Sequence, residues 1–480
     1  MSGNTGWRRI NIRVMRHAVM GVPREPRIFT KGNDMPNAAA VAQAATVPRT
    51  DAMEPAAQAV YRKIAWKVLP FLIICYLFAY LDRVNVGFAK LQMLQDLGFS
   101  ETAYGLGAGL FFIGYLIFEA PSNVWMMKVG ARKTIMRIML LWGLLSMCFA
   151  FVQTPTQFYV LRFLLGAAEA GFFPGIVLYL TFWFPSRVRG RMLGLFMAAI
   201  PLSGVVGAPL SGWIMHGMHD SSGLAGWQWL FLMEGCPSVL MALLVPWLLT
   251  DTPAQARWLT EEEKKRVHAD LDADARAKDG MGGFHPTILV MLKDARVWAM
   301  VALCICQAIG NYGVSFWLPT LVKDLGYQDP LIIGLLSAIP FLAGAIALNL
   351  IARSSDRRLE RRWHLIFGFI VSATGLAGSA LLHANPVAAL AALTVGTAGV
   401  FMATTMMWML PSLFLGGVGM AAAIGVINSL GGLGGFVSPY LMGIVKDATH
   451  STAGGIYFIA GIAVVGAVLA YRLPKHLVNR

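Results

Sequence analysis

The sequence predicts an all-α membrane protein in which twelve transmembrane helices form two pseudo-symmetric six-helix bundles. Apolar residues make up 57% of the 480-residue chain and charged residues only 13%, whereas soluble domains have about 45–50% and about 25%. The mean hydropathy is +0.61, so lipid must be part of the solvent. A long polar connection near the middle divides the apolar stretches into six and six.

Each expected span is a stretch of about 20 apolar residues, the length that a helix needs to cross a hydrocarbon core of ~30 Å. Helices are the only option, because an open sheet would leave backbone groups unsatisfied in lipid. The fifty glycines are typical of closely packed membrane helices. The expected spans are 66–88, 102–124, 134–152, 156–184, 190–214, 227–249, 297–320, 330–352, 363–382, 386–411, 416–445 and 454–472.

The segments outside the spans complete the expected organisation. Bundles at 66–249 and 295–473 are joined by a linker at 250–294, and tails at 1–65 and 474–480 flank them. Thr260-Glu-Glu-Glu263 is a capping box that predicts a charged amphipathic helix in the linker. Residues 1–33 are basic and lack an apolar core, which excludes a secretory signal. They indicate a disordered tail, or a true start at Met35.

The basic residues predict the orientation. Loops 125–133, 185–191 and 353–362 carry eleven Lys and Arg, and the opposite short loops carry three. The positive-inside rule therefore places both termini in the cytoplasm of a cell whose inner (plasma) membrane holds the protein. It also accounts for the net charge of +14, so we expect no nucleic-acid partner.

The two halves resemble each other at an offset of about 230 residues. Gly204-x-x-Gly207-x-Pro209 in the fifth span corresponds to Gly434-x-x-Val437-x-Pro439 in the eleventh. Together with the six-plus-six division, such matches indicate a duplicated bundle. A binding site is expected between the halves.

Charges deep in the spans are the candidate functional residues, because a charge at membrane depth costs several kcal/mol on insertion scales. All of them lie in the first half, so the second half would contribute neutral polar and aromatic groups. The deep charges are Asp82, Arg83, Glu119, Arg162, Glu169 and Glu234, and the neutral groups are Gln307, Asn311, Tyr312, Trp408 and Asn428.

Two carboxylates and two arginines of this set can form a network. Arg162 and Glu169 share one helix face, two turns apart, while the adjacent Asp82 and Arg83 cannot point the same way. An arginine fork suits a carboxylate ligand, and two acids sharing an arginine could exchange it for a proton when an anion arrives. The alternative is a structural network that only joins helices.

Two further acids leave different roles open. Glu119 lies toward the cytoplasmic end of the second span, where a gate contact with the basic loops is expected. Glu234 could cap a helix or face the exit path.

These residues resemble those of the major facilitator superfamily, and more narrowly of its anion:cation symporter family, over about residues 60–472. The family includes bacterial permeases for tartrate, phthalate, hydroxyphenylacetate and sugar acids. The resemblance rests on Leu81-Asp-Arg-Val-Asn85, Gly114-Tyr115, Pro121-Ser-Asn123, Arg162-Phe-Leu-Leu-Gly166, Glu169-Ala-Gly171, Pro174, Phe182-Trp-Phe-Pro185 and Asp251-x-Pro253.

The resemblance implies alternating access with proton-driven uptake of an organic anion. It implies that Arg83 holds the substrate carboxylate, that Asp82 and Glu169 take up protons, and that Arg162 links the two acids. Tyr80, Tyr115 and Asn428 would line the central cavity.

The expected gate consists of Glu119, Arg132, Asp356 and Arg357. The superfamily has an acid-plus-basic signature between spans two and three. In this sequence Met127 stands where that signature usually has an aspartate, which argues against an inter-domain salt bridge there. Asp356-Arg357 keeps the corresponding pattern in the other half.

Competing functions follow from the same sequence. An anion exchanger or a drug-efflux facilitator is the alternative, although efflux of cationic drugs would favour buried acids without a binding arginine. Neither nucleophile motif, phosphate loop nor metal constellation stands out, so we expect no enzyme, metal or cofactor. The expected partners are a small organic carboxylate, protons and the lipid bilayer, and the expected state is a monomer.

Overall fold

The computed structural model describes residues 54–218, 220–279, 293–411 and 419–474. The helical bundles belong to one compact unit, residues 56–480. In the described residues, twelve helices are long and apolar enough to cross a membrane, which confirms the predicted fold class. The interpretation of residues 1–33, and of Met35 as a start, lies outside the described residues.

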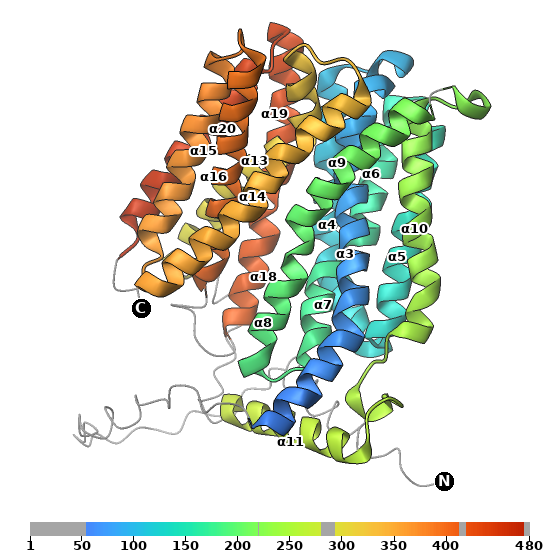
Figure 1. Cartoon of the computed structure of the whole chain (residues 1–480), viewed down its shortest axis with the longest axis vertical. Helices are drawn as coiled ribbons and strands as arrows, with labels where there is room; N and C mark the ends of the chain where they lie inside the picture. Colours follow the sequence, from blue (N-terminus) through green and yellow to red (C-terminus); the bar gives the residue numbers. More distant parts are fainter. Residues whose placement is uncertain (1–53, 219, 280–292, 412–418, 475–480) are drawn as a thin grey trace. The chain divides into compact units, whose positions relative to one another are not determined.

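The first bundle contains the six spans before the linker (Figure 1). Two of these spans are each built from two helices. Its helices are α3 (Pro55–Leu97), α4 (Glu101–Val129), α5 (Ala131–Cys148), α6 (Pro155–Glu169), α7 (Phe172–Thr181), α8 (Ser186–Met197), α9 (Ala199–Gly217) and α10 (Gly226–Leu248).

The second bundle repeats this plan after the linker helix α11 (Glu261–Asp279). Its eleventh span is again divided, here at Gly432. Its helices are α13 (Ala295–Asp324), α14 (Pro330–Arg358), α15 (Arg362–Leu381), α16 (Pro386–Met409), α18 (Gly419–Gly431), α19 (Leu433–Thr449) and α20 (Ala453–Arg472).

The break in the fourth span was not predicted, and it lies beside a candidate site residue. Gly171 has a φ of 86°, a left-handed conformation that residues with a Cβ rarely adopt. Helix α6 therefore ends at Glu169, and α7 starts again at Phe172.

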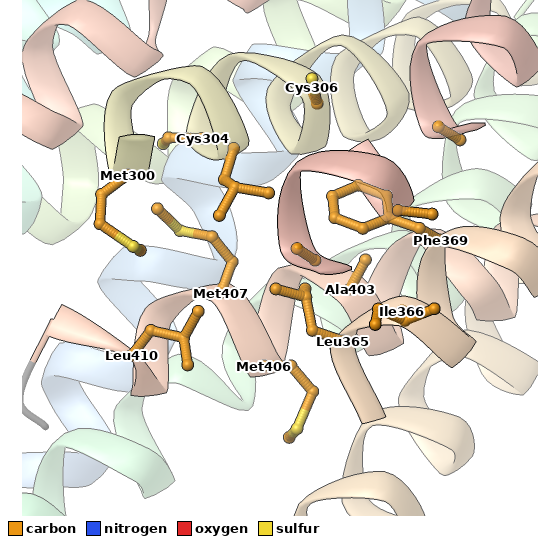
Figure 2. Close-up of a cluster of buried hydrophobic side chains, with 14 of the residues drawn as sticks. Met300, Cys304, Cys306, Leu365, Ile366, Phe369, Ala403, Met406, Met407 and Leu410 are labelled. Atoms are coloured by element: carbon orange, nitrogen blue, oxygen red, sulfur yellow. The ribbon is translucent and has the colours of Figure 1, made fainter. Parts of the chain in front are cut away.

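The interior of the second bundle is apolar and rich in sulfur. Figure 2 shows Met300, Cys304, Met406 and Met407 packed with aliphatic and aromatic side chains of α13, α15 and α16. Thioether and thiol groups fill irregular gaps between helices without needing a polar partner.

The duplicated bundles meet through equivalent helices. Helix α9 packs on α14, and α19 packs on α4, so the fifth span of each half contacts the second span of the other. Close approach of the backbones makes this possible. A Cβ on Gly105 would collide with the carbonyl of Pro439, and a Cβ on Gly334 with the carbonyl of Ala208.

The linker helix is attached to the first bundle. Asp270 of α11 accepts a hydrogen bond from Tyr61 (2.7 Å) and pairs with Arg187 of α8 (2.9 Å). Glu263 pairs with Lys63 (2.8 Å). These contacts explain why α3 begins at Pro55, whereas the expected tail reached residue 65. We call the membrane face bearing α11 and the basic loops the basic face, and the other the opposite face.

Candidate functional site

The guanidinium of Arg83 is enclosed by aromatic rings of the first bundle, on the side that faces the second. Its central carbon is 5.2 Å from the ring centroid of Phe111, 5.7 Å from that of Tyr80 and 5.8 Å from that of Tyr115. Arg83 is only 8% exposed. Aromatic faces attract a cation, and the attraction grows when water is excluded, so the rings stabilise a buried charge.

Glu169 is the ionic partner of Arg83. The two side chains form a buried ion pair between α3 and the last residue of α6. Helix α6 starts at a complete capping box of Thr154 and Gln157, which satisfies its first backbone N–H groups. The break at Gly171 ends the helix just beyond Glu169, so local sequence fixes both ends of the element that carries the acid.

The second bundle reaches this pair through Tyr312 of α13. Arg83 Nη1 lies 3.4 Å from the hydroxyl of Tyr312, a long hydrogen bond. The ring of Tyr312 packs against Phe112 of α4, with centroids 4.4 Å apart. Tyr312 was among the neutral groups expected from the second half, and the structure places it at Arg83.

Two buried donors at this point have no hydrogen-bond partner among the described residues. They are Nε of Arg83 and the hydroxyl of Tyr80. Leaving a buried donor unpaired costs about 1–3 kcal/mol. A ligand with carboxylate oxygens would remove that cost.

Asp82 points away from Arg83, into the interior of the first bundle. Its carboxylate accepts hydrogen bonds from Trp142 Nε1 (2.7 Å), Ser146 Oγ (2.9 Å) and Ser238 Oγ (2.8 Å). Helices α3, α5 and α10 are thereby joined at one carboxylate. Among the described residues, no ion pair links Asp82 with either arginine of the expected network, and no hydrogen bond links it with Glu169.

Arg162 is also separate from the two acids it was expected to link. Its Nε and Nη2 each lie 3.4 Å from a backbone carbonyl of α4, those of Gly107 and Ala108. The guanidinium is 5.2 Å from the ring of Phe111, so this one ring lies near both arginines of the expected network. By direct contact, the structure brings together Arg83 and Glu169 of the predicted network.

Glu119 and Asn428 form a contact between the bundles. The Glu119 carboxylate accepts hydrogen bonds from Asn428 Nδ2 and Ser429 Oγ of α18, both at 2.9 Å. The sequence predicted a gate contact with the basic loops, but the partners of Glu119 are neutral groups of the other bundle. Asn428, expected to line the cavity, is used in this contact.

The remaining gate candidates lie apart from one another. Arg132 donates its backbone N–H to Asp251 (2.8 Å) and its guanidinium to the carbonyl of Pro246 (3.3 Å), so it joins α5 to the end of α10. Asp356 pairs with Arg361 within the second bundle (2.6 Å), and Arg357 is exposed.

The opposite face is closed by charged groups from both bundles. Lys446 Nζ of α19 lies 3.4 Å from Glu101 Oε1 of α4. The Asp447 carboxylate accepts hydrogen bonds from the backbone N–H groups of Glu101 (3.1 Å) and Thr102 (2.8 Å). Lys90 pairs with Glu101 at 2.6 Å. We call Lys90, Glu101, Lys446 and Asp447 the opposite-face cluster.

Sequence reasoning missed the residues that hold the deep charges. Phe111, Trp142, Ser146 and Ser238 were not singled out in the sequence. The four-residue spacing of Trp142 and Ser146 places both side chains on one helix face. It was the available clue.

Comparisons with known proteins agree on the kind of molecule. The family model described as Major Facilitator Superfamily matches residues 72–439. A protein of Pseudomonas putida assigned as a metabolite transport protein, NicT, is 47% identical over 88% of this chain and 96% of its own. A protein of Agrobacterium vitis assigned as a tartrate transporter is 46% identical over 87% and 91%.

Two further similarities bear on drug efflux and on the fold. A quinolone resistance transporter of Acinetobacter baumannii is 43% identical over 86% of this chain and 94% of its own. The structure of the xylose transporter XylE from E. coli superposes with a TM-score of 0.69 at 16% identity, covering 86% of this chain and 98% of that one.

Proposed function

Because this chain belongs to the Major Facilitator Superfamily, we propose that it imports an organic carboxylate together with protons by alternating access. It is a multi-pass membrane transporter. The substrate class we propose is a small organic anion, tartrate-like or aromatic. The protein acts as a monomer in the inner (plasma) membrane, with the basic face and both termini in the cytoplasm.

The setting of Arg83 carries this proposal. It is a buried guanidinium between the bundles, and its Nε has no partner among the described residues. A planar guanidinium presents several N–H donors in a geometry that matches a carboxylate. The Tyr80 hydroxyl, the ring of Tyr115 and the hydroxyl of Tyr312 surround the same point. A substrate carboxylate would bind Arg83 and contact both bundles at once.

Glu169 would couple this binding to protons. In the described conformation Glu169 forms an ion pair with Arg83, which neutralises its negative charge. An anion that takes over the guanidinium leaves a buried carboxylate without its cation, which is costly unless the carboxylate binds a proton. Asp82 is the second proposed proton carrier, and Arg162 positions α4 through its carbonyl contacts.

The gate would consist of contacts that break in each cycle. The contact of Glu119 with Asn428 closes the interface between the bundles toward the basic face. The opposite-face cluster closes it on the other side. Arg132, Asp356 and Arg357 would stiffen the basic loops around the inner gate.

The test is uptake into proteoliposomes with Arg83→Lys. Lysine keeps the charge but loses the planar fork, so uptake of L-tartrate or phthalate should fall at least tenfold while the variant still reconstitutes. Uptake by the wild-type protein should require an inward proton gradient and collapse with a protonophore. Uptake by Arg83→Lys at the wild-type rate would exclude the carboxylate clamp, and uptake driven by sodium would exclude proton coupling.

Exchange of anions or efflux of a drug remains the alternative function. The similarity to a quinolone resistance transporter favours it. Arg83 is a poor partner for a purely cationic drug but a good one for a compound that carries a carboxylate. Competition of a quinolone with L-tartrate for binding to purified protein would separate the two readings.

A further inference from the structure

The mechanism proposed above does not use Glu234, a buried carboxyl in the first bundle. It lies on α10 and is 2% exposed. One oxygen, Oε1, accepts a hydrogen bond from Ser211 of α9 at 2.7 Å. The other, Oε2, has no hydrogen-bond partner among the described residues. Within those residues, no Lys, Arg or His forms an ion pair with it.

The polar groups that face Glu234 come from α3 and α9. Asn85 of α3 is 1% exposed, and both polar atoms of its amide lack partners among the described residues. Asp82 lies one helical turn before Asn85 on α3, and Ser238 lies one turn after Glu234 on α10. Asp82 accepts a hydrogen bond from Ser238. Because α3 and α10 run in opposite directions, this register places Asn85 beside Glu234. Asp82 is the charged group that acts on Glu234, and Ser211 and Asn85 are its neutral neighbours.

This environment fits a neutral carboxylic acid better than a carboxylate. An ionised carboxylate at this depth would have only neutral donors, the Ser211 hydroxyl and the Asn85 amide, together with a nearby carboxylate and no cation in ion-pair contact, and such burial is strongly unfavourable. A protonated carboxyl has one donor and one acceptor. A primary amide has both as well, so the unpartnered atoms of Glu234 and Asn85 complement each other once Oε2 carries a proton.

We propose that Glu234 is a proton-binding site of the transport cycle, occupied by a proton in this conformation, and that its proton enters from the opposite face. The inference rests on the proposed proton-coupled function and adds a carrier that is independent of the Arg83–Glu169 pair.

The packing of α9 suggests how the proton reaches Glu234. Ser211, which binds Glu234, is adjacent to Gly212, and a Cβ on Gly212 would collide with the carbonyl of Pro330 at the start of α14. The helix turn that holds Ser211 is therefore sealed by the second bundle. When the bundles separate at the opposite face, α14 withdraws from this turn, and water can reach the Ser211–Glu234 hydrogen bond.

The experiment compares wild-type protein with Glu234→Gln by two measurements. The first is the infrared difference spectrum between mildly acidic and alkaline buffer, in which the wild-type protein should show a carboxylic C=O band that the variant lacks. The second is the ratio of protons to L-tartrate or phthalate, measured from the reversal potential in proteoliposomes. That ratio should fall by one proton in the variant. Glu262→Gln, an exposed acid on α11, is the matched control and should change neither.

Two outcomes would overturn the inference. An unchanged infrared spectrum in Glu234→Gln would mean that Glu234 is ionised. A lost band with an unchanged proton ratio would mean that the acid is neutral but only structural. A wild-type protein with no proton dependence would instead refute the proposed function, and the infrared band would still report the state of Glu234.

A second variant covers the case in which Glu234→Gln does not fold. Ser211→Ala removes the donor to Oε1 and keeps the acid. The carboxylic band should then shift to higher frequency, because the carbonyl loses its hydrogen bond. An unshifted band would show that the band does not belong to Glu234, and the inference would fail.

Discussion

Removal of the Asp447 side chain should open the opposite face. Its carboxylate belongs to α19 of the second bundle and accepts the backbone N–H groups of Glu101 and Thr102, which begin α4 in the first. It therefore caps a helix of the other bundle, where a negative charge is favoured by the helix dipole. These contacts would be lost if the bundles separated at this face.

The size of the effect follows from the two hydrogen bonds. Hydrogen bonds to charged groups contribute about 1.5–3 kcal/mol each, but Asp447 is exposed, so water weakens them. We take about 1.5 kcal/mol for the pair. Since about 1.4 kcal/mol corresponds to a tenfold change in an equilibrium constant, Asp447→Ala should raise the ratio of open to closed protein about tenfold. Asp447→Asn should have a smaller effect, because asparagine can still cap a helix.

The assay is a distance measurement between spin labels at two exposed positions, Gln95 in the first bundle and Gln328 in the second. The exposed Cys148 and Cys236 would first be replaced by serine. The long-distance population should grow in Asp447→Ala. Asp96→Ala is the control, because Asp96 binds Trp227 of its own bundle (2.8 Å). Equal distance distributions in Asp447→Ala and the parent protein would refute the capping argument.

Two further predictions concern coupling and the linker. Glu169→Gln mimics a permanently protonated acid, so uphill accumulation should be lost while counterflow exchange of labelled substrate is kept; loss of both in a folded variant would indicate a structural role. The hydrogen bond from Lys63 lowers the pKa of Glu263 on α11. The Lys63–Glu263 contact therefore stabilises the docked linker at pH values above the ordinary carboxyl range, and this stabilisation is lost as the pH falls through the lowered pKa. Hydrogen exchange of α11, corrected for intrinsic rates, should show this loss, and Lys63→Met should weaken the pH dependence, the part due to Thr260 remaining.

The fold could be predicted because apolar length is a strong signal in a membrane protein. The span count and the six-plus-six division follow from hydropathy alone. The match of Gly204–Pro209 with Gly434–Pro439 predicted that the fifth and eleventh spans are equivalent, and each of them packs on the second span of the other bundle. The break at Gly171 escaped notice because hydropathy averages over a whole span. The helical residues 55–65 were also missed, since contacts with α11 stabilise them rather than their own sequence.

The candidate site was predicted less completely, for a geometric reason. Adjacent residues on a helix point in different directions, so Asp82 and Arg83 had to separate. The sequence could not show which of them faces Glu169. The choice depends on Trp142 and Ser146, which supply hydrogen bonds to Asp82 from a helix distant in sequence. The roles assigned to these residues in transport stay predictions.

The uneven distribution of charge suggests how the two bundles communicate. The deep charges lie in the first bundle, so movement of the second leaves the Arg83–Glu169 pair intact. What such a movement would change are hydrogen bonds between a charged group of the first bundle and a neutral group of the second, those of Tyr312 with Arg83 and of Asn428 with Glu119. Such contacts would break more readily than the ionic contacts of the opposite-face cluster. A bound carboxylate that joins Arg83 to Tyr312 would therefore give the moving bundle its strongest tie to the charged one, so that the bundles rock together when the substrate is present.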